Sequence, residues 1–195
     1  MKNTAKLSAT SAAALFIFGA LVACGDPTGT TNPTTPNLGV YSTPRTALVA
    51  RRSDPLTSDI SVSALIGPAG GIMKIKETGL TVQFPAGALD QAVQITVTAK
   101  AGDMLAYEFE PHGLKFNANV KITQKLDKIH AGSSLANAFV GYYADPAALD
   151  AESGTAQILE GLPISIATAD RVVRAHVRHF SGYLVASNCL RNFHD

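Results

Sequence analysis

The sequence predicts an all-β protein: an antiparallel β-sandwich that follows a cleaved signal peptide and a disordered tether. Three observations support this fold class. Apolar and polar residues alternate with a period of two in many short segments, as they do in half-buried strands. Gly and Pro bound these segments, and no segment sustains the period of 3.6 that marks a helix. Short strands at this spacing are typical of two packed sheets.

Residues 1–23 have the features of a secretory signal. Two lysines near the start precede the apolar run 12–22, AAALFIFGALV, which is too short for a permanent membrane span. The run ends in Leu21-Val22-Ala23-Cys24, which resembles the lipobox of bacterial lipoproteins. The resemblance implies cleavage before Cys24 and acylation of Cys24, an anchor stronger than a single acyl chain. The alternative is an ordinary secretory signal with a chance cysteine.

Residues 24–58 are expected to form a lipid-anchored tether. Positions 26–37 are almost entirely Thr, Pro, Gly and Asn, which have little apolar surface to bury and favour a disordered, partly extended chain. Residues 38–58 leave two interpretations open. The first is a solvated linker with a short edge strand. The second places three arginines near anionic lipid headgroups, namely Arg45, Arg51 and Arg52.

Residues 59–195 form the predicted sandwich. The clearest strand is 93–99, where apolar residues occupy one face and Gln or Thr the other. The segment 85–89 is expected to be a structured turn, because Pro85 has no N–H to donate to a strand ladder. A hairpin turn is expected at Thr78-Gly79, and 147–154 is either one helical turn or a loop. The predicted strands are 60–65, 73–76, 80–84, 93–99, 105–109, 120–126, 138–143, 157–159, 164–167 and 171–186.

Several short motifs in this domain carry a resemblance to a known family. They are Gly70-Gly71, then 79–82 (GLTV), 84–89 (FPAGAL) and 111–116 (PHGLKF). Together they resemble the ZU-five domain, the β-sandwich module named for zonula occludens and Unc-five proteins. The resemblance covers residues 67–187 and implies a domain that acts as an interaction or scaffold module. One departure is Asn119, where the family often has Pro.

Composition and motif spacing argue against several functional classes. The net charge is +1, so no broad basic field attracts nucleic acid. Two cysteines, Cys24 and Cys189, are too few for a disulfide framework or a zinc cluster, and lipidation of the first leaves the second without an intrachain partner. His176 and His179 are three residues apart in a strand, which places them on opposite faces. No phosphate-binding glycine loop and no G-x-S-x-G elbow is present, so we expect no metal, no cofactor and no conventional enzyme activity.

The tripeptide His179-Phe180-Ser181 is the one candidate catalytic group. The alternation of the strand that contains it slips by one residue, which predicts a bulge or kink within 179–182. The tripeptide resembles the self-cleavage site of certain ZU-five proteins with death domains and of a self-cutting nuclear-pore protein. That resemblance implies His179 as base, Ser181 as nucleophile and the Phe180–Ser181 bond as the one broken, through an ester formed by acyl shift. The alternative is an ordinary strand with a buried Phe180.

These features predict a membrane-anchored bacterial lipoprotein that presents a non-enzymatic β-sandwich in the cell envelope, facing the periplasm or the surface. The partners expected are the membrane, through the lipid, and an envelope component or protein that the sequence does not identify. A self-cleaving domain is the first alternative. An envelope-binding or carbohydrate-binding module is the second, and it calls for exposed aromatic residues on one face. The candidates for that face are Tyr107, Tyr142, Tyr143 and Tyr183.

Overall fold

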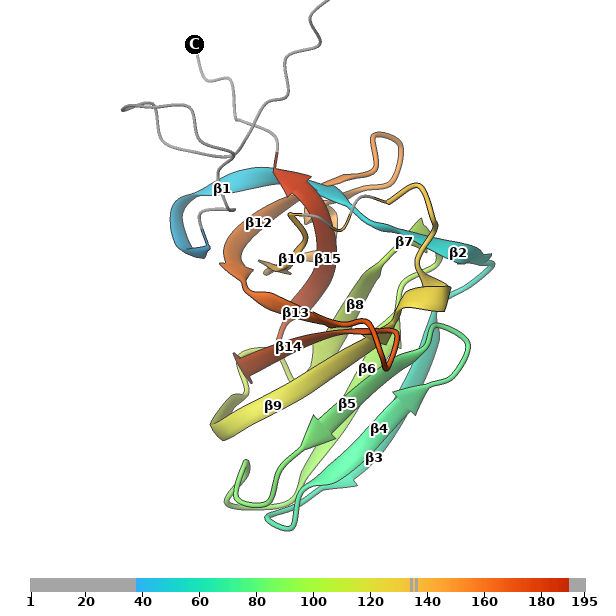
Figure 1. Ribbon diagram of the computed structural model, residues 1–195. Helices are drawn as coiled ribbons and strands as arrows, with labels where there is room; N and C mark the ends of the chain where they lie inside the picture. The colour runs from blue at the N-terminus through green and yellow to red at the C-terminus, as the bar shows by residue number, and fades with distance from the viewer. Residues whose placement is uncertain (1–37, 134, 136, 190–195) are drawn as a thin grey trace, which may run out of the picture.

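The computed structural model describes residues 38–133, 135 and 137–189 of the 195-residue chain. Throughout this part the chain is all-β, with antiparallel sheets and two short 3-10 turns. Two sheets stack face to face in a sandwich-like arrangement, and in Figure 1 the five-stranded sheet crosses in front of strands β6 and β8. The fold class predicted from alternation is therefore confirmed at the level of an all-β, antiparallel, sandwich-like protein.

The larger sheet has eight strands, in the order β1-β12-β10-β15-β8-β6-β3, with the short β11 paired to β12. Its strands alternate between buried and exposed residues over much of their length. The bounds are β1 Gly39–Val49, β3 Ile60–Ile66, β6 Val93–Ala99, β8 Ala106–Glu110, β10 Phe139–Tyr143, β11 Leu149–Asp150, β12 Thr155–Leu162 and β15 Gly182–Cys189.

The smaller sheet has five strands, in the order β13-β14-β9-β5-β4. A third sheet is a two-stranded pair of β2 and β7. The bounds are β2 Arg51–Leu56, β4 Gly71–Ile75, β5 Leu80–Phe84, β7 Gly102–Met104, β9 Lys115–Lys125, β13 Ile164–Ala167 and β14 Val172–His179. The 3-10 turns are η1, Leu126–Lys128, and η2, Pro146–Ala148.

The main hydrophobic core lies between the two large sheets. Ile95 and Val97 of β6 point inward from one sheet, while Val120 and Ile122 of β9 do so from the other. Gln124 is also buried there, with its amide nitrogen on the carbonyl oxygen of Thr78 at 2.7 Å and its amide oxygen accepting from the Tyr107 hydroxyl at 2.7 Å. A buried amide with both ends bonded ties the sheets together without leaving an unpaired polar group.

A second, smaller core fills a closed ring of four strands. β1 pairs with β12 and also with β15, and β10 joins β12 to β15, so the large sheet curls back on itself at the top of Figure 1. The ring is narrow, because a Cβ at Gly141 would touch the side chains of Ile158 and Leu184. The buried residues of this core are Ala47, Val49, Met104, Ala106, Phe139, Tyr143, Ala156, Ile158, Leu184 and Ala186.

Residues 38–56 depart from the expectation of a tether. β1 is an eleven-residue strand of the large sheet, and Ala47 and Val49 are buried in the ring. β2 pairs with β7, and Arg52 is 3% exposed, so its side chain cannot lie among lipid headgroups. The folded part therefore begins at Gly39 and not at residue 59. The Thr, Pro and Arg residues of β1 made this strand hard to predict from the sequence, because few of its side chains face a core.

Most predicted strands are found, with shifts of a few residues at their ends. β5, β6 and β13 have the predicted bounds, and the turn at Thr78-Gly79 joins β4 to β5 as expected, with Gly79 at a φ of 72°. β9 begins five residues earlier than predicted. The single strand expected over 171–186 is two strands, β14 and β15, which belong to different sheets.

The predicted irregularity within 179–182 is confirmed, and the fold gives its cause. The pairing of β14 with β9 shifts register between Val177 and His179, and the chain then bends at Ser181. The bend carries the chain from the small sheet to the large one. β15 is buried on both faces, since Tyr183 and Val185 face the sandwich core while Leu184 and Ala186 face the ring. This double burial explains the slip in the hydrophobic pattern.

Candidate functional site

Three of the four motif segments, Gly70-Gly71, 84–89 and 111–116, meet at one end of the sandwich. The backbone N–H of Gly87 donates to the carbonyl oxygen of Pro68 at 2.8 Å, and the N–H of Asn117 donates to that of Ala88 at 3.0 Å. The segment 111–116 is joined in turn to the His-Phe-Ser tripeptide. Gly113 N–H donates to the Phe180 carbonyl oxygen at 2.8 Å, and Phe180 N–H donates to the Leu114 carbonyl oxygen at 2.8 Å.

Four phenylalanines pack together beneath these backbone contacts. The ring of Phe180 lies 4.6 Å from that of Phe116, 4.8 Å from Phe109 and 5.8 Å from Phe84, measured between centroids. Two of these contacts are close to perpendicular, the edge-to-face arrangement that the ring quadrupole favours. Phe180 is completely buried, so its first role is to anchor the bend to the main core.

His179 lies at the centre of a polar cluster that joins three elements of the large sheet to β14. Its Nε2 is 3.1 Å from Oε2 of Glu160 on β12, and its Nδ1 is 3.1 Å from the hydroxyl oxygen of Tyr183 on β15. The ring of Tyr142 on β10 meets the imidazole edge to face at 5.1 Å. These four residues are called the His179 cluster from here on. The His179 side chain is one-third exposed, so the cluster lies at the surface.

The geometry separates His179 from the role of base that the resemblance implies. A carboxylate only accepts hydrogen bonds, so Nε2–H donates to Glu160, while Nδ1 lies 3.1 Å from a hydroxyl whose single proton goes either to Nδ1 or to the His179 carbonyl oxygen. Both ring nitrogens thus lie within hydrogen-bond distance of side chains other than Ser181. The structure brings the three residues of the tripeptide together at a bend and buries Ser181, but it directs the imidazole toward Glu160 and Tyr183.

Tyr183 holds the backbone of the bend as well as the ring. Its hydroxyl donates to the carbonyl oxygen of His179 at 2.7 Å. Burial, and then the neighbouring charge of Glu160, raise the pKa of the Tyr183 hydroxyl well above its ordinary value, so this group stays protonated and remains a donor at neutral pH. Sequence reasoning missed Glu160 as a partner of His179, because nothing in the pattern of β12 marks this residue.

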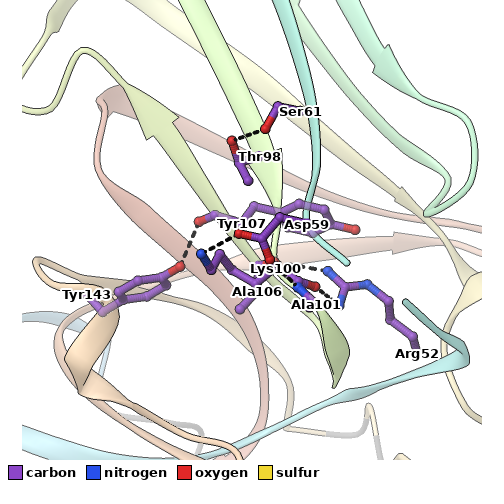
Figure 2. Close-up of polar contacts among 9 residues, drawn as sticks. All are labelled: Arg52, Asp59, Ser61, Thr98, Lys100, Ala101, Ala106, Tyr107 and Tyr143. Carbon is purple, nitrogen blue, oxygen red and sulfur yellow. Dashed lines mark hydrogen bonds and ion pairs between the residues drawn. The ribbon is translucent and has the colours of Figure 1, made fainter. Parts of the chain in front are cut away.

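The most constrained charge in the domain is Arg52, which sequence reasoning also missed. Its guanidinium donates to the backbone carbonyl oxygens of Lys100 and Ala106, each at 3.0 Å (Figure 2). It donates to the Met104 carbonyl oxygen of β7 as well. The cation also lies over the Tyr107 ring, 5.3 Å from its centroid. Burial lowers the pKa of Arg52 below its ordinary value. A planar donor fork satisfies several carbonyls at once, which is why an arginine suits this position.

Two further contacts near Arg52 stabilise the large sheet, one at the closed ring of four strands and one at the sheet surface. Tyr143 donates to the Tyr107 carbonyl oxygen at 3.0 Å, and its ring occupies the space where a Cβ of residue 182 would lie, so that Gly182 is required there (Figure 2). At the sheet surface, Lys100 forms an ion pair with Asp59 at 2.6 Å. The first contact spans from β10 to β8 across β15, and the second joins residues at the ends of β3 and β6, so both serve the fold.

The tyrosines proposed for a carbohydrate-binding face do not form one. Tyr107, Tyr143 and Tyr183 are 3%, 1% and 2% exposed, and Tyr142 is half-buried against His179. They point into the cores or into the His179 cluster. The observation that a sugar-binding sandwich requires, a row of exposed aromatic rings, is therefore not met by these four residues.

The predicted lipidation site, Cys24, lies outside the described residues. Among residues 38–189, apart from the two gaps, no helix is long and apolar enough to cross a membrane. No group of three His, Cys, Asp or Glu side chains in this same part of the chain could hold a metal ion. No model of a protein family matches the chain, and no curated protein matches it significantly.

Proposed function

We propose that this protein is a bacterial lipoprotein, anchored through Cys24, that presents a non-enzymatic interaction or scaffold domain in the cell envelope. The observation that carries the proposal is the apolar run 12–22 that closes on Leu21-Val22-Ala23-Cys24, followed at once by a polar, Pro-rich segment. A chain over 25–38 reaches at most about 50 Å when fully extended. Because β1 begins at Gly39, the domain would stay close to the membrane surface.

The finer form of the proposal is a ZU-five-like domain. It is supported by the way three of the motif segments, Gly70-Gly71, 84–89 and 111–116, contact one another at one end of the sandwich. Gly87 of the FPAGAL segment and Gly113 of the PHGLKF segment both have positive φ angles, 77° and 75°, which explains why glycine occupies both turns. Leu89 of the same segment is buried in the core, as its pattern predicts. The motifs thus coincide with the turns and core contacts of the fold.

The anchor is tested by labelling cells that express the full chain with radioactive palmitate. We expect label on the wild-type protein and its complete loss in Cys24→Ser, together with release of the protein from membranes washed in high salt. Cys189→Ser is the matched control and should keep both the label and the membrane association. Retention of Cys24→Ser in salt-washed membranes would show that the attachment does not depend on acylation.

The interaction role is tested on the anchored protein itself. A tagged full chain, cross-linked in cells and purified from solubilised membranes, should bring down a defined envelope component in stoichiometric amount. The same experiment with Cys24→Ser separates recognition by the domain from proximity at the membrane. Recovery of the tagged chain with no enriched component under either condition would contradict a scaffold role.

A second candidate function, self-cleavage at Phe180–Ser181, is favoured by one observation. The carbonyl oxygen of Phe180 accepts a hydrogen bond from the Gly113 N–H at 2.8 Å. A backbone donor on this oxygen would stabilise the negative charge that develops there when a hydroxyl attacks the carbonyl carbon. Ser181 is adjacent and buried at the bend. The engagement of both His179 nitrogens by Glu160 and Tyr183 makes this the weaker of the two functions.

A further inference from the structure

In the described part of the chain, one long edge of the large sheet has no strand paired to it. At its other end the sheet closes on itself, because β1 pairs with both β12 and β15. β3 is the last strand of the order and pairs with β6 along all seven of its residues, Ile60–Ile66, without a bulge. The opposite side of β3 therefore presents a row of backbone N–H and C=O groups along a regular edge.

This edge lacks the features that usually block strand pairing. Natural edge strands carry charges, prolines or bulges, or are very short. The edge strand β4 of the small sheet carries Lys74, and β13 at the other edge has four residues. The sequence of β3 is ISVSALI, which contains no charged residue and no proline. Leu65 is 67% exposed, and Ile60, Val62 and Ala64 are partly buried against the main core.

We propose that β3 is a homodimer interface, in which two copies of this chain pair antiparallel, edge to edge, about a two-fold axis at Ser63. An isologous contact requires a surface that complements itself. With this axis Ser63 faces Ser63 of the second copy, Ser61 faces Leu65 and Val62 faces Ala64. The two side chains of each pair lie on the same face of the sheet. On the core side, apolar side chains therefore meet apolar ones.

The absence of charge decides between a second copy and a foreign strand. A peptide partner recognised by strand addition gains specificity from side-chain pockets or charges beside the edge, and β3 itself offers neither. Two copies of β3 meet without like charges opposite each other. Their hydroxyl-bearing faces join as well, since Ser61 and Ser63 already bond to Thr98 and Thr96 of β6 at 2.8 Å. The dimer would continue the large sheet from one molecule into the next.

The register is tested by disulfide trapping in the purified full-length chain. Residues directly opposite in an antiparallel pair have Cα atoms about 4.5–5.5 Å apart, within disulfide range. Oxidation of Ser63→Cys with copper phenanthroline should therefore give a disulfide-linked dimer, which reductant converts back to monomer on a denaturing gel. Ser61→Cys is the matched control: its two copies would lie about 13 Å apart, so it should remain at the wild-type level. The double variant S61C/L65C should cross-link again.

A charge exchange tests the interface without cysteines. Ser63 is exposed, so Ser63→Lys and Ser63→Glu should fold, which circular dichroism would verify. Each variant places two like charges at the axis, and a tagged copy should no longer co-purify an untagged copy of the same variant. Mixing the Lys and Glu variants should restore co-purification, and Ser63→Ala should retain it. Equal cross-linking of S61C and S63C, or failure of the mixed pair to associate, would overturn the proposal.

Discussion

The hydroxyl group of Tyr183 donates to the carbonyl oxygen of His179 at 2.7 Å, across the bend that carries the chain from β14 to β15. The same hydroxyl is 3.1 Å from Nδ1 of the His179 ring. One phenol therefore holds both the backbone and the side chain of the residue before Phe180. The bend is stabilised by side-chain contacts from the large sheet as well as by the aromatic packing of Phe180.

The first prediction concerns this hydroxyl. Tyr183→Phe keeps the buried ring but leaves the His179 carbonyl without its donor, so we expect a loss of about 1–3 kcal/mol in the free energy of unfolding. Urea denaturation at neutral pH measures it. Tyr142→Phe is the matched control, because Tyr142 contacts His179 through its ring, and its loss should be well below that of Tyr183→Phe. Equal losses would show that the hydrogen bond contributes nothing.

The second prediction concerns the buried guanidinium. Arg52→Ala leaves several carbonyl oxygens around β7 without their donor and opens a cavity beside Tyr107, so it should destabilise the protein by about 2–4 kcal/mol. Arg52→Lys should recover only part of this, since an ammonium group cannot span the same set of carbonyls.

The neighbouring Arg51 provides the control for Arg52. Its side chain is 47% exposed and pairs with Asp103 at the surface, an interaction that contributes about 1 kcal/mol or less. Thermal melts of Arg51→Ala and Arg52→Ala should therefore differ widely. Similar melting temperatures would mean that the carbonyls around β7 are equally well solvated without Arg52.

The third prediction compares two glycines with almost the same backbone conformation. Gly87 has a φ of 77° and open space around a built Cβ, whereas Gly70 has a φ of 76° and a Cβ that would overlap the Phe84 carbonyl oxygen. Gly87→Ala should cost about 1–2 kcal/mol from backbone strain alone. Gly70→Ala should cost about 3 kcal/mol or more, because backbone atoms must also move. Chemical denaturation of both variants tests which loses more stability. A larger loss in Gly87→Ala than in Gly70→Ala would contradict the prediction.

The fourth prediction concerns acid stability. The hydrogen bond from Lys100, and then the backbone N–H of Ala101, hold the pKa of Asp59 below its usual value. A carboxyl whose pKa is depressed on folding stabilises the protein above its unfolded pKa of about 3.9, and this contribution is lost as the pH falls through the folded pKa. Wild type should therefore exceed Asp59→Asn in stability at neutral pH, and the difference should shrink below pH of about 4.

Lys100 provides the control for the acid prediction. In a Lys100→Met background the main cause of the Asp59 shift is gone, so Asp59→Asn should show a weaker dependence on pH. The effect is small in either background, because the Asp59 side chain is 42% exposed and solvent screens the pair. Melting curves recorded at intervals of about 1 pH unit between pH 2 and 7 would show this pH dependence. A pH-independent difference between wild type and Asp59→Asn would exclude the ion pair as its source.

The sequence predicts the strands that have one buried face, and it fails where burial does not follow alternation. In β6, Ile95, Val97 and Ala99 face the core while Gln or Thr faces out, so a local pattern suffices. β1 has a bulge between Val40 and Arg45, and its buried residues near the end are small, so the strand has no clear period. Its place depends on pairing with strands more than a hundred residues away, which no local pattern records.

The candidate site was predictable in part for the same reason. The slip around His179-Phe180-Ser181 is local and indicates the bend, whereas the pairing of His179 with Glu160 depends on the two sheets meeting. Arg52 could not be found from its neighbours, because a charged residue in a polar segment ordinarily indicates solvent. Its burial follows from the backbone carbonyl groups in and beside β7 that point toward it, those of Lys100, Met104 and Ala106. Long-range polar contacts of this kind arise only from the folded arrangement.

The last prediction concerns the bond between Phe180 and Ser181. We expect the wild-type chain to remain intact there for days at neutral pH, because both nitrogens of the His179 ring face side chains other than Ser181, namely Glu160 and Tyr183. Denaturing mass spectrometry is the required measurement. A fragment 181–195 would contain the whole of β15 and would stay bound through the pairing of β15 with β8 and β10, so native size would not reveal a cut.

Variants of the tripeptide and its cluster decide what an observed cut would mean. A fragment that begins at Ser181, and that disappears in Ser181→Ala while the fold is retained, would contradict our expectation and establish self-cleavage. His179→Ala should then slow cutting by about 10²–10⁴-fold, the usual effect of losing a general base. Glu160→Gln keeps the ring environment but removes the carboxylate that accepts from Nε2–H. If His179 is the base and its present contacts restrain it, Glu160→Gln should cut faster than wild type, whereas an unbroken chain in both proteins means that the bend serves the fold alone.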